Sequence, residues 1–332
     1  MKMRRREFVA GLGTSISLWS LTAHAQRENS VPRIGALLAF DEKDSMAQGW
    51  VAALKDQLRK LGWLEGQNIQ IDFRWASSDV KAMQQFAEEL IALRPDVILS
   101  SSTPPTRILM QHTRTIPIVF ANLVDPVGSK LVESLAKPGG NVTGFVNLEP
   151  SIAGKWLELL KEIAPSIGRV AIPYNPTTAP YAEIYLSNFK SAGAALALQT
   201  IAGPVRDLSE LETFVAAQGG GPNVGLVPVP DGFMNSMRGN LATLAARYRI
   251  PTAHFNRAFV SDGGLISYGN DTNDNYRRAA VYLDRILKGE KPSELAVQFP
   301  IKFEFTINLR TAKALGLNVP VTLLARADEV IE

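Results

Sequence analysis

Short apolar segments and amphipathic segments alternate along the chain, and this alternation occurs twice. In the first run, strand-like segments lie at residues 33–38, 68–75, 96–100 and 116–121. Helical patterns lie at 46–61, 80–93, 104–113 and 130–136. Strands joined by helices at this spacing lie parallel, with helices on both faces of the sheet. The pattern predicts an α/β fold with doubly wound parallel sheets, and the mixed polarity of 68–75 places that strand near a sheet edge.

The second run begins after a break near residues 141–150. Its helical patterns lie at 152–163, 181–192, 208–217 and 232–248. Its strand-like segments lie at 169–173, 196–201, 224–229 and 252–255. Two runs of the same kind predict two similar lobes.

The C-terminal segment holds too few elements for a third domain. Its strands are expected at 264–267 and 299–307, and its helices at 273–287 and 309–315. We expect the chain to recross between the lobes here and to complete both sheets, because several crossings make a hinge for domain closure. The predicted division is a leader at 1–25, an N-terminal lobe at 30–143 plus about 268–295, and a C-terminal lobe at 144–267 plus about 296–332.

The first 25 residues have the features of an export signal. Lys2 and three consecutive Arg at 4–6 precede a mostly apolar stretch at 9–21, which is too short to span a bilayer. Ala-His-Ala at 23–25 is an A-x-A site, so we expect cleavage after Ala25. The Arg pair also fits the twin-arginine pattern, and the Tat and Sec routes both stay open. The chain has no Cys, so we expect a freely diffusing periplasmic protein and not a lipoprotein.

The basic charge of the chain resides in this leader. The whole chain has a net charge of +3, and the leader carries four Lys or Arg and one Glu, so the remainder is near neutral. A nucleic-acid binder needs a basic patch that survives processing, and we expect no nucleic-acid partner. The sequence has three His and no G-x-S-x-G, H-E-x-x-H or P-loop motif. We therefore expect no enzyme activity, no cofactor and no metal.

Polar residues stand where the predicted strands end, and ligands of parallel α/β sheets bind outside those ends. Ser102 and Thr103 begin a helix, where free N–H groups favour a ligand carboxylate, although either residue could simply be an N-cap. Asp125 and Asp231 could face a ligand ammonium or cap the helices that follow. The candidate ligand-binding residues are Phe40, Asp41, Ser101, Ser102, Thr103, Asn122, Asp125, Tyr174, Asn175, Asp231, Asn256 and Tyr268.

Aromatic residues near the same strand ends could supply an apolar wall. Tyr174, Phe255 and Tyr268 could stack on an apolar part of a ligand or belong to the core. His254 ends a predicted strand and could face the cleft. Small-molecule sites combine such apolar walls with a few placed polar groups.

Several motifs together resemble one known family. They are Asn-Leu-Val-Asp-Pro-Val-Gly at 122–128, Lys-Pro-Gly-Gly-Asn-Val-Thr-Gly at 137–144, Gly-Gly-Leu-Ile-Ser-Tyr-Gly at 263–269 and Arg-Ala-Asp-Glu-Val at 326–330. This combination is similar to the ABC-transporter substrate-binding family whose characterised members include tryptophan and tyrosine binders. The resemblance implies a type I periplasmic-binding-protein fold, a three-stranded hinge and a ligand between the lobes.

The resemblance also carries over positions in the cleft. Residues 102–104 and 122–125 match its first-lobe segments, and 174–176 and 231–234 match its second-lobe segments. Many relatives have a Tyr-Pro-Phe-Arg run after the strand ending near Ala253, whereas this chain has His-Phe-Asn-Arg at 254–257. This departure implies a different specificity if that loop contacts the ligand.

The sequence thus predicts a monomeric periplasmic solute-binding protein. It would capture a small organic ligand, an amino acid or an aromatic or carboxylate compound, and deliver it to an ABC permease in the inner membrane. A periplasmic sensor for a membrane receptor shares the same fold and stays open as an alternative. A secreted enzyme using carboxylates such as Asp41 and Asp231 is the third hypothesis.

Overall fold

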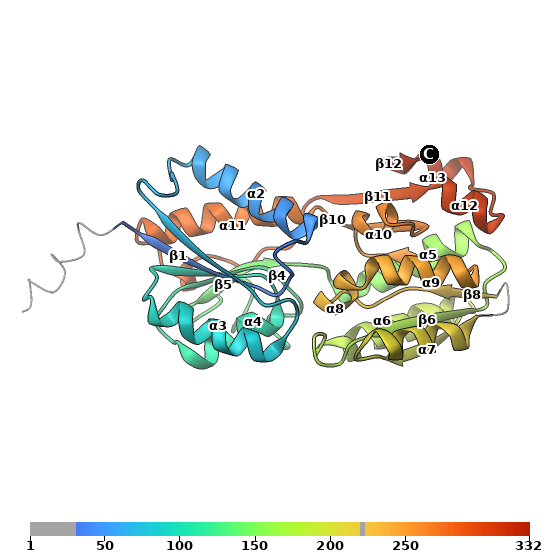
Figure 1. Ribbon diagram of the computed structural model, residues 1–332, viewed down its shortest axis with the longest axis horizontal. Helices are drawn as coiled ribbons and strands as arrows, with labels where there is room; N and C mark the ends of the chain where they lie inside the picture. The colour runs from blue at the N-terminus through green and yellow to red at the C-terminus, as the bar shows by residue number, and fades with distance from the viewer. Residues whose placement is uncertain (1–30, 220–222) are drawn as a thin grey trace, which may run out of the picture.

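A computed structural model describes residues 31–219 and 223–332, and it contains two α/β lobes side by side (Figure 1). The predicted leader and its cleavage site lie outside the described residues. None of the described helices combines the length and hydropathy needed to cross a bilayer.

The first lobe is built on a five-stranded parallel sheet of order β2-β1-β3-β4-β5. Its strands are β1 (Arg33–Leu38), β2 (Gln70–Trp75), β3 (Val97–Ser100), β4 (Ile118–Leu123) and β5 (Val142–Val146). Its helices are α2 (Ser45–Lys60), α3 (Val80–Ala92), α4 (Thr103–His112) and α11 (Thr272–Leu287). Helices α2 and α11 pack together on one side, and α3 and α4 on the other (Figure 1). Strand β2 lies at the edge, as its mixed polarity predicted.

The second lobe repeats this design with seven strands in two hydrogen-bonded groups, β7-β6-β8 and β12-β11-β10-β9. A β-bridge between Leu226 and Thr252 joins the groups. The strands are β6 (Arg169–Tyr174), β7 (Gln199–Pro204), β8 (Val224–Leu226), β9 (Ala253–His254), β10 (Ile266–Asn270), β11 (Phe303–Asn308) and β12 (Glu329–Ile331). All neighbours are parallel except β10 and β11.

The helices of the second lobe cover both faces of its sheet. They are α5 (Ala153–Ile163), α6 (Ala182–Ala195), α7 (Leu208–Gln218), α8 (Gly232–Ser236), α9 (Arg238–Tyr248), α10 (Arg257–Ser261), α12 (Leu309–Leu315) and α13 (Val321–Leu324). The chain moves one way across the sheet from β6 to β7 and the other way from β7 to β8. Right-handed crossovers therefore place α6 and α7 on opposite faces of the sheet. The predicted doubly wound α/β class is therefore the observed one.

Three segments cross between the lobes and form the hinge. They follow β5, follow β10, and precede β11. The backbone N–H of Val146 donates to Gln298 O at 2.8 Å, and that of Asp271 donates to Lys302 O at 3.0 Å, so the crossings lie side by side. The predicted boundary between the lobes, at 143/144, falls inside β5. This strand pairs with β4 and so belongs to the first sheet.

Strand β5 passes unusually close to its neighbour. A Cβ at Gly144 would lie 2.0 Å from the carbonyl oxygen of Phe120, and Gly144 has φ +147°. Only glycine fits such a close approach with this backbone conformation. The strand therefore depends on a residue that, in sequence, resembles part of a loop.

Some predicted elements are wrong. Residues 130–136 form turns instead of a helix, because Lys130 has φ +55° and the N–H groups of Leu131 and Val132 both donate to Pro126 O. The predicted helix 232–248 is broken at Met237 into α8 and α9. Strand β7 begins three residues later than predicted, since Ala197 takes a left-handed turn conformation with φ +53°.

Two buried tyrosines allow a matched test of how much a hydroxyl hydrogen bond contributes to stability in the core. Tyr185 Oη donates to Leu148 O in the first crossing at 3.0 Å, whereas the Tyr276 hydroxyl has no partner within the described residues. Both residues are fully buried. We expect Tyr185→Phe to lower the free energy of unfolding by about 1 kcal/mol or more, and Tyr276→Phe to leave it unchanged or raise it, because an unmade buried hydrogen bond carries a desolvation cost. Urea unfolding monitored by circular dichroism measures both, and equal losses in the two variants would contradict the assignment.

Candidate ligand-binding site

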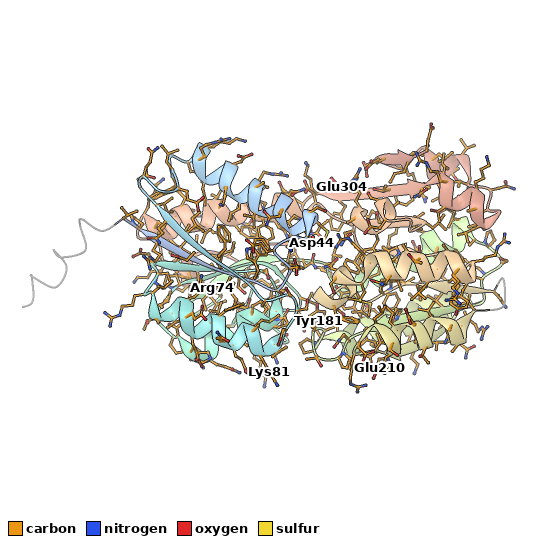
Figure 2. All side chains as sticks on the ribbon, viewed as in Figure 1. Asp44, Arg74, Lys81, Tyr181, Glu210 and Glu304 are labelled. Atoms are coloured by element: carbon orange, nitrogen blue, oxygen red, sulfur yellow. The ribbon has the colours of Figure 1, made fainter. Side chains whose placement is uncertain are left out.

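A narrow cavity lies between the lobes, next to the hinge. The first lobe contributes Phe40, Trp50, Ser101, Ser102 and Asn122. The second lobe contributes Tyr181, Pro230, Asp231, Gly232, Asn235, Phe255 and Asn256, and the crossings with the start of α11 contribute Asn147, Asn270 and Thr272. Figure 2 shows Tyr181 at the junction of the lobes.

The first-lobe wall offers hydrogen-bond donors. Ser101 Oγ accepts from Ala39 N at 2.8 Å, which leaves its proton available. Ser102 occupies the N-cap position of α4, yet its side chain makes no capping bond. Asn122 Oδ1 accepts from Asn275 Nδ2 at 3.1 Å, so the Asn122 amide N–H groups are left for the cavity. This wall suits a ligand carboxylate.

The start of α4 contributes less to anion binding than its sequence suggested. Pro104 and Pro105 fill the first turn and have no N–H group. The predicted site at this helix end therefore depends on the Ser102 hydroxyl and the Thr103 N–H, not on a row of backbone donors.

The second-lobe wall offers acceptors, led by the buried carboxylate of Asp231. Asp231 Oδ1 accepts from Met234 N at 2.7 Å and from Thr178 Oγ1 at 3.2 Å, and Oδ2 accepts from Asn175 N at 3.3 Å. Burial raises the pKa of Asp231 to about 6, although these hydrogen bonds act in the opposite direction. The same carboxylate therefore caps α8, as one of its two predicted roles required, and also lines the cavity; contact with a ligand ammonium stays a prediction.

Five asparagines line the cavity, and two of them hold unpaired amide atoms. Asn256 Nδ2 donates to Asn235 Oδ1 at 2.8 Å, while Asn256 Oδ1 is buried without a partner. Asn270 is only 6 % exposed, and its Nδ2 also lacks a partner within the described residues. Buried polar atoms are normally hydrogen-bonded, so these two atoms indicate where a ligand group would bind.

Aromatic rings supply the apolar part of the wall. Phe40 meets Trp50 edge-on, with ring centroids 4.9 Å apart, and Trp50 stacks on Tyr276 at 5.7 Å. The Tyr181 hydroxyl is already engaged, since it donates to Pro230 O at 2.7 Å. Tyr181 and Phe255 both line the cavity from the second lobe.

The structure brings six of the twelve predicted site residues to this cavity: Phe40, Ser101, Ser102, Asn122, Asp231 and Asn256. Contact between any of them and a ligand stays a prediction. The rule that strand ends form the site identified these residues, because Asn122 lies near the end of β4 and the other five follow a strand.

The other six lie away from the cavity wall, and most of them hold the nearby backbone. Thr103 Oγ1 accepts from Val124 N at 3.2 Å, and Asp125, at φ +47°, accepts from Gly128 N at 2.9 Å. Asn175 Oδ1 accepts from Thr177 N at 2.8 Å. Asp125 and Asn175 bond to their own turns, as short polar side chains after a strand readily do, whereas Thr103 links the start of α4 to the residue that follows β4.

The remaining three have different surroundings. Asp41 is exposed and accepts from Lys43 N at 2.8 Å. Tyr268 stacks on Phe303 at 5.7 Å in the hinge, and burial raises the pKa of Tyr174 at the end of β6. His254 does not face the cleft: it is fully buried against Phe259 at 4.0 Å, and burial lowers its pKa to about 3.

The sequence analysis missed nine wall residues, or left them outside the candidate set. They are Trp50, Asn147, Tyr181, Pro230, Gly232, Asn235, Phe255, Asn270 and Thr272. Trp50 lies on the buried face of α2, where a core role is the ordinary expectation. Asn147 and Asn270 lie at the crossings, and strand-end reasoning within one lobe does not reach them. No group of three or more metal-ligating side chains occurs within 31–219 and 223–332.

The free hydroxyl of Ser102 can be distinguished from a helix cap. We expect Ser102→Ala to leave the melting temperature nearly unchanged, because its side chain makes no capping bond. Asp79→Ala serves as the control, since Asp79 caps α3 by accepting from Lys81 N at 2.8 Å, and it should cost about 1 kcal/mol. Differential scanning calorimetry measures both. A loss in Ser102→Ala that equals the loss in the control would mean that Ser102 is a structural cap.

Comparison with known proteins identifies the family. Residues 35–331 match the model of the ABC transporter substrate binding protein family. The chain is 28 % identical over 287 residues to the tyrosine-binding protein of Clostridioides difficile strain R20291, covering 86 % of this chain and 80 % of that protein.

Solved structures agree. A conserved domain protein from Vibrio cholerae has a TM-score of 0.84 and 27 % identity, over 91 % of this chain and all of that one. The ABC domain from Streptococcus pneumonia in complex with L-Trp has a TM-score of 0.84 and 25 % identity, with the same coverage. These matches confirm the resemblance and the type I periplasmic-binding-protein fold. The chain therefore belongs to the ABC transporter substrate binding protein family, and it is a substrate-binding protein and not an enzyme.

Proposed function

We propose that this protein captures an α-amino acid with an aromatic or other apolar side chain between its lobes and delivers it to an ABC importer. The observation that carries this proposal is the polarity of the cavity. Hydroxyl and amide donors lie on the first-lobe wall, the carboxylate of Asp231 lies on the second-lobe wall, and aromatic rings lie between them. A zwitterion with an apolar body complements all three features.

The charge of the cavity wall favours an amino acid over a simple carboxylic acid as the ligand. Asp231 is the only charged side chain among the described residues that line the cavity. An anionic ligand would be buried beside this carboxylate without a cation to pair with it, which is costly. An amino acid brings its own ammonium group to Asp231, so we prefer it to the aromatic or carboxylate compound that the sequence left open.

The relatives support the same class of ligand. One is described as a tyrosine-binding protein, and a solved relative holds L-Trp. Closure of the two lobes around such a ligand would present one closed surface to a permease, with differential affinity for the closed form driving the change.

We also propose that the protein works as a monomer in the periplasm and does not bind nucleic acid. The charge run, apolar run and A-x-A site of residues 1–25 support export, and their removal leaves a nearly neutral chain. Expression of the full chain in a Gram-negative host, followed by osmotic shock and mass spectrometry, should yield a soluble periplasmic product beginning at Gln26. Retention of the whole product in the cytoplasm with residues 1–25 intact would contradict this location.

The role of Asp231 provides the test of the ligand class. We expect calorimetry with a panel of the twenty amino acids to show binding of L-tryptophan or L-tyrosine. Asp231→Asn keeps an oxygen for the α8 cap but loses the charge, and should weaken binding roughly 10- to 100-fold, the loss of a hydrogen bond to a charged group. Asp207→Asn is the matched control, because exposed Asp207 caps α7 through Glu210 N and lies outside the cavity.

The affinity of the wild-type protein should also depend on pH. The free Asp231 carboxyl has a pKa of about 6, and a ligand ammonium favours its ionised form. Affinity should therefore be full above pH 6 and fall by up to about tenfold per unit below it, while Asp231→Asn shows no such fall. Equal affinity at pH 8 and pH 5 in the wild type, or an unaffected Asp231→Asn variant, would reject an ammonium at this carboxylate.

A further inference from the structure

Away from the hinge, a single ion pair joins the two lobes within the described residues. Arg238, the first residue of α9 in the second lobe, donates from Nη1 to Oδ2 of Asp44, which stands before α2 in the first lobe. Figure 2 places Asp44 at the junction of the lobes. The side chains are 17 % and 12 % exposed, so the pair is largely screened from water.

Both partners have second contacts that do not depend on the pair. Asp44 Oδ1 caps α2 by accepting from Met46 N and Ala47 N at 2.9 Å. The Nε of Arg238 lies 2.9 Å from Asp262 Oδ2, within the second lobe. Separation of the lobes would break the contact between Arg238 and Asp44 but would leave these second contacts in place. The pair contributes to closure and little to the fold of either lobe.

The same short segment also forms the ligand-cavity wall. Asp231, Gly232 and Asn235 lie on that wall, and Arg238 Nη1 donates to the carbonyl oxygen of Asn235 at 3.0 Å. A movement of α8 toward a ligand therefore brings Arg238 toward Asp44. The interlobe contact and part of the cavity wall therefore lie on one short segment, residues 231–238.

We propose that Arg238 is a positioning residue that holds the lobes closed over the ligand through Asp44. The inference rests on capture between the lobes, but not on which ligand is captured. The pair should increase affinity by slowing ligand release, since neither of its side chains lines the cavity.

A second interlobe contact makes closure directly measurable. A Cβ built on Gly232 would lie 3.9 Å from Ser78 Cβ in the opposite lobe. Natural disulfides join Cβ atoms about 3.5–4.5 Å apart, and the chain has no Cys of its own. The double variant Ser78→Cys with Gly232→Cys should therefore form a disulfide only when the lobes close.

The experiment measures how fast this disulfide forms in ligand-free protein kept in a fixed glutathione buffer. Gel electrophoresis without reductant separates the disulfide-bonded form from the reduced form. Adding Arg238→Gln should slow the rate about tenfold. Asp44→Asn keeps the α2 cap but loses the charge, and should slow it similarly; the two changes together should slow it no more than either alone. Raising the salt from about 0.05 M to about 1 M should slow the parent and leave Arg238→Gln unaffected, because salt screens ion pairs.

Arg247→Gln is the matched control, since exposed Arg247 lies on the same helix and forms no ion pair with any residue that the structure describes, and it should not change the rate. Equal rates with and without Arg238, additive effects of the two substitutions, or no disulfide in the parent pair would each overturn the proposal. The same variants without the Cys pair are then tested with L-tryptophan, whose dissociation rate should rise about tenfold in Arg238→Gln. If the disulfide rates respond as expected but no variant binds any amino acid, the proposed ligand class fails and the role of Arg238 stands.

Discussion

Backbone hydrogen bonds between the three crossing segments set the relation of the two lobes, and the site depends on that relation. The bonds from Val146 N to Gln298 O and from Asp271 N to Lys302 O join segments far apart in the sequence. A side chain of the second lobe attaches to the first of these crossings, since Tyr185 Oη donates to Leu148 O, and Trp156 Nε1 donates at 2.6 Å to Tyr268 O in β10, just before the second crossing. The strand ends of both sheets can then face one cavity, although neither sheet could form it alone.

Polar groups within the cavity divide into those committed to the fold and those that remain available. Asp231 is largely committed, since both of its oxygens accept hydrogen bonds while one face of it lines the cavity. Ser102 and Asn270 are available: the Ser102 side chain makes no capping bond, and the Asn270 amide nitrogen has no hydrogen-bond partner among the described residues. The polar groups that are bonded to the turns fix the backbone of the wall. The backbone in turn fixes the polar groups that remain available, and long, flexible charged side chains are not needed. Such a site can present fixed polar groups to a ligand although Asp231 is the one charged side chain among the described residues that line it.

The fold could be predicted from sequence because buried parallel strands are short apolar runs, and β1, β3 and β4 have that form. β5 was missed because Gly144 resembles loop sequence, whereas its need arises from the backbone of Phe120, a contact across the sheet. Half of the predicted site residues reach the cavity because the rule on strand ends is a property of the sheet. Asp125 and Asn175 do not, since their local turns compete for the same side chains. The positions of Trp50 and Asn270 on the cavity wall could not be predicted from the sequence. Trp50 lies on a helix face and Asn270 beside a chain crossing, and these surfaces line a cavity only when the two lobes come together.

The two unpaired amide atoms, Asn256 Oδ1 and Asn270 Nδ2, have a consequence for the empty protein. When the lobes separate, water can reach them, but empty closure buries them without partners, at about 1 kcal/mol or more for each atom. The interlobe pair of Arg238 and Asp44 acts in the opposite direction. A ligand that pairs with both atoms removes this cost, whereas the ion pair forms on closure with or without a ligand. The two amide atoms would therefore make closure depend on the presence of a ligand.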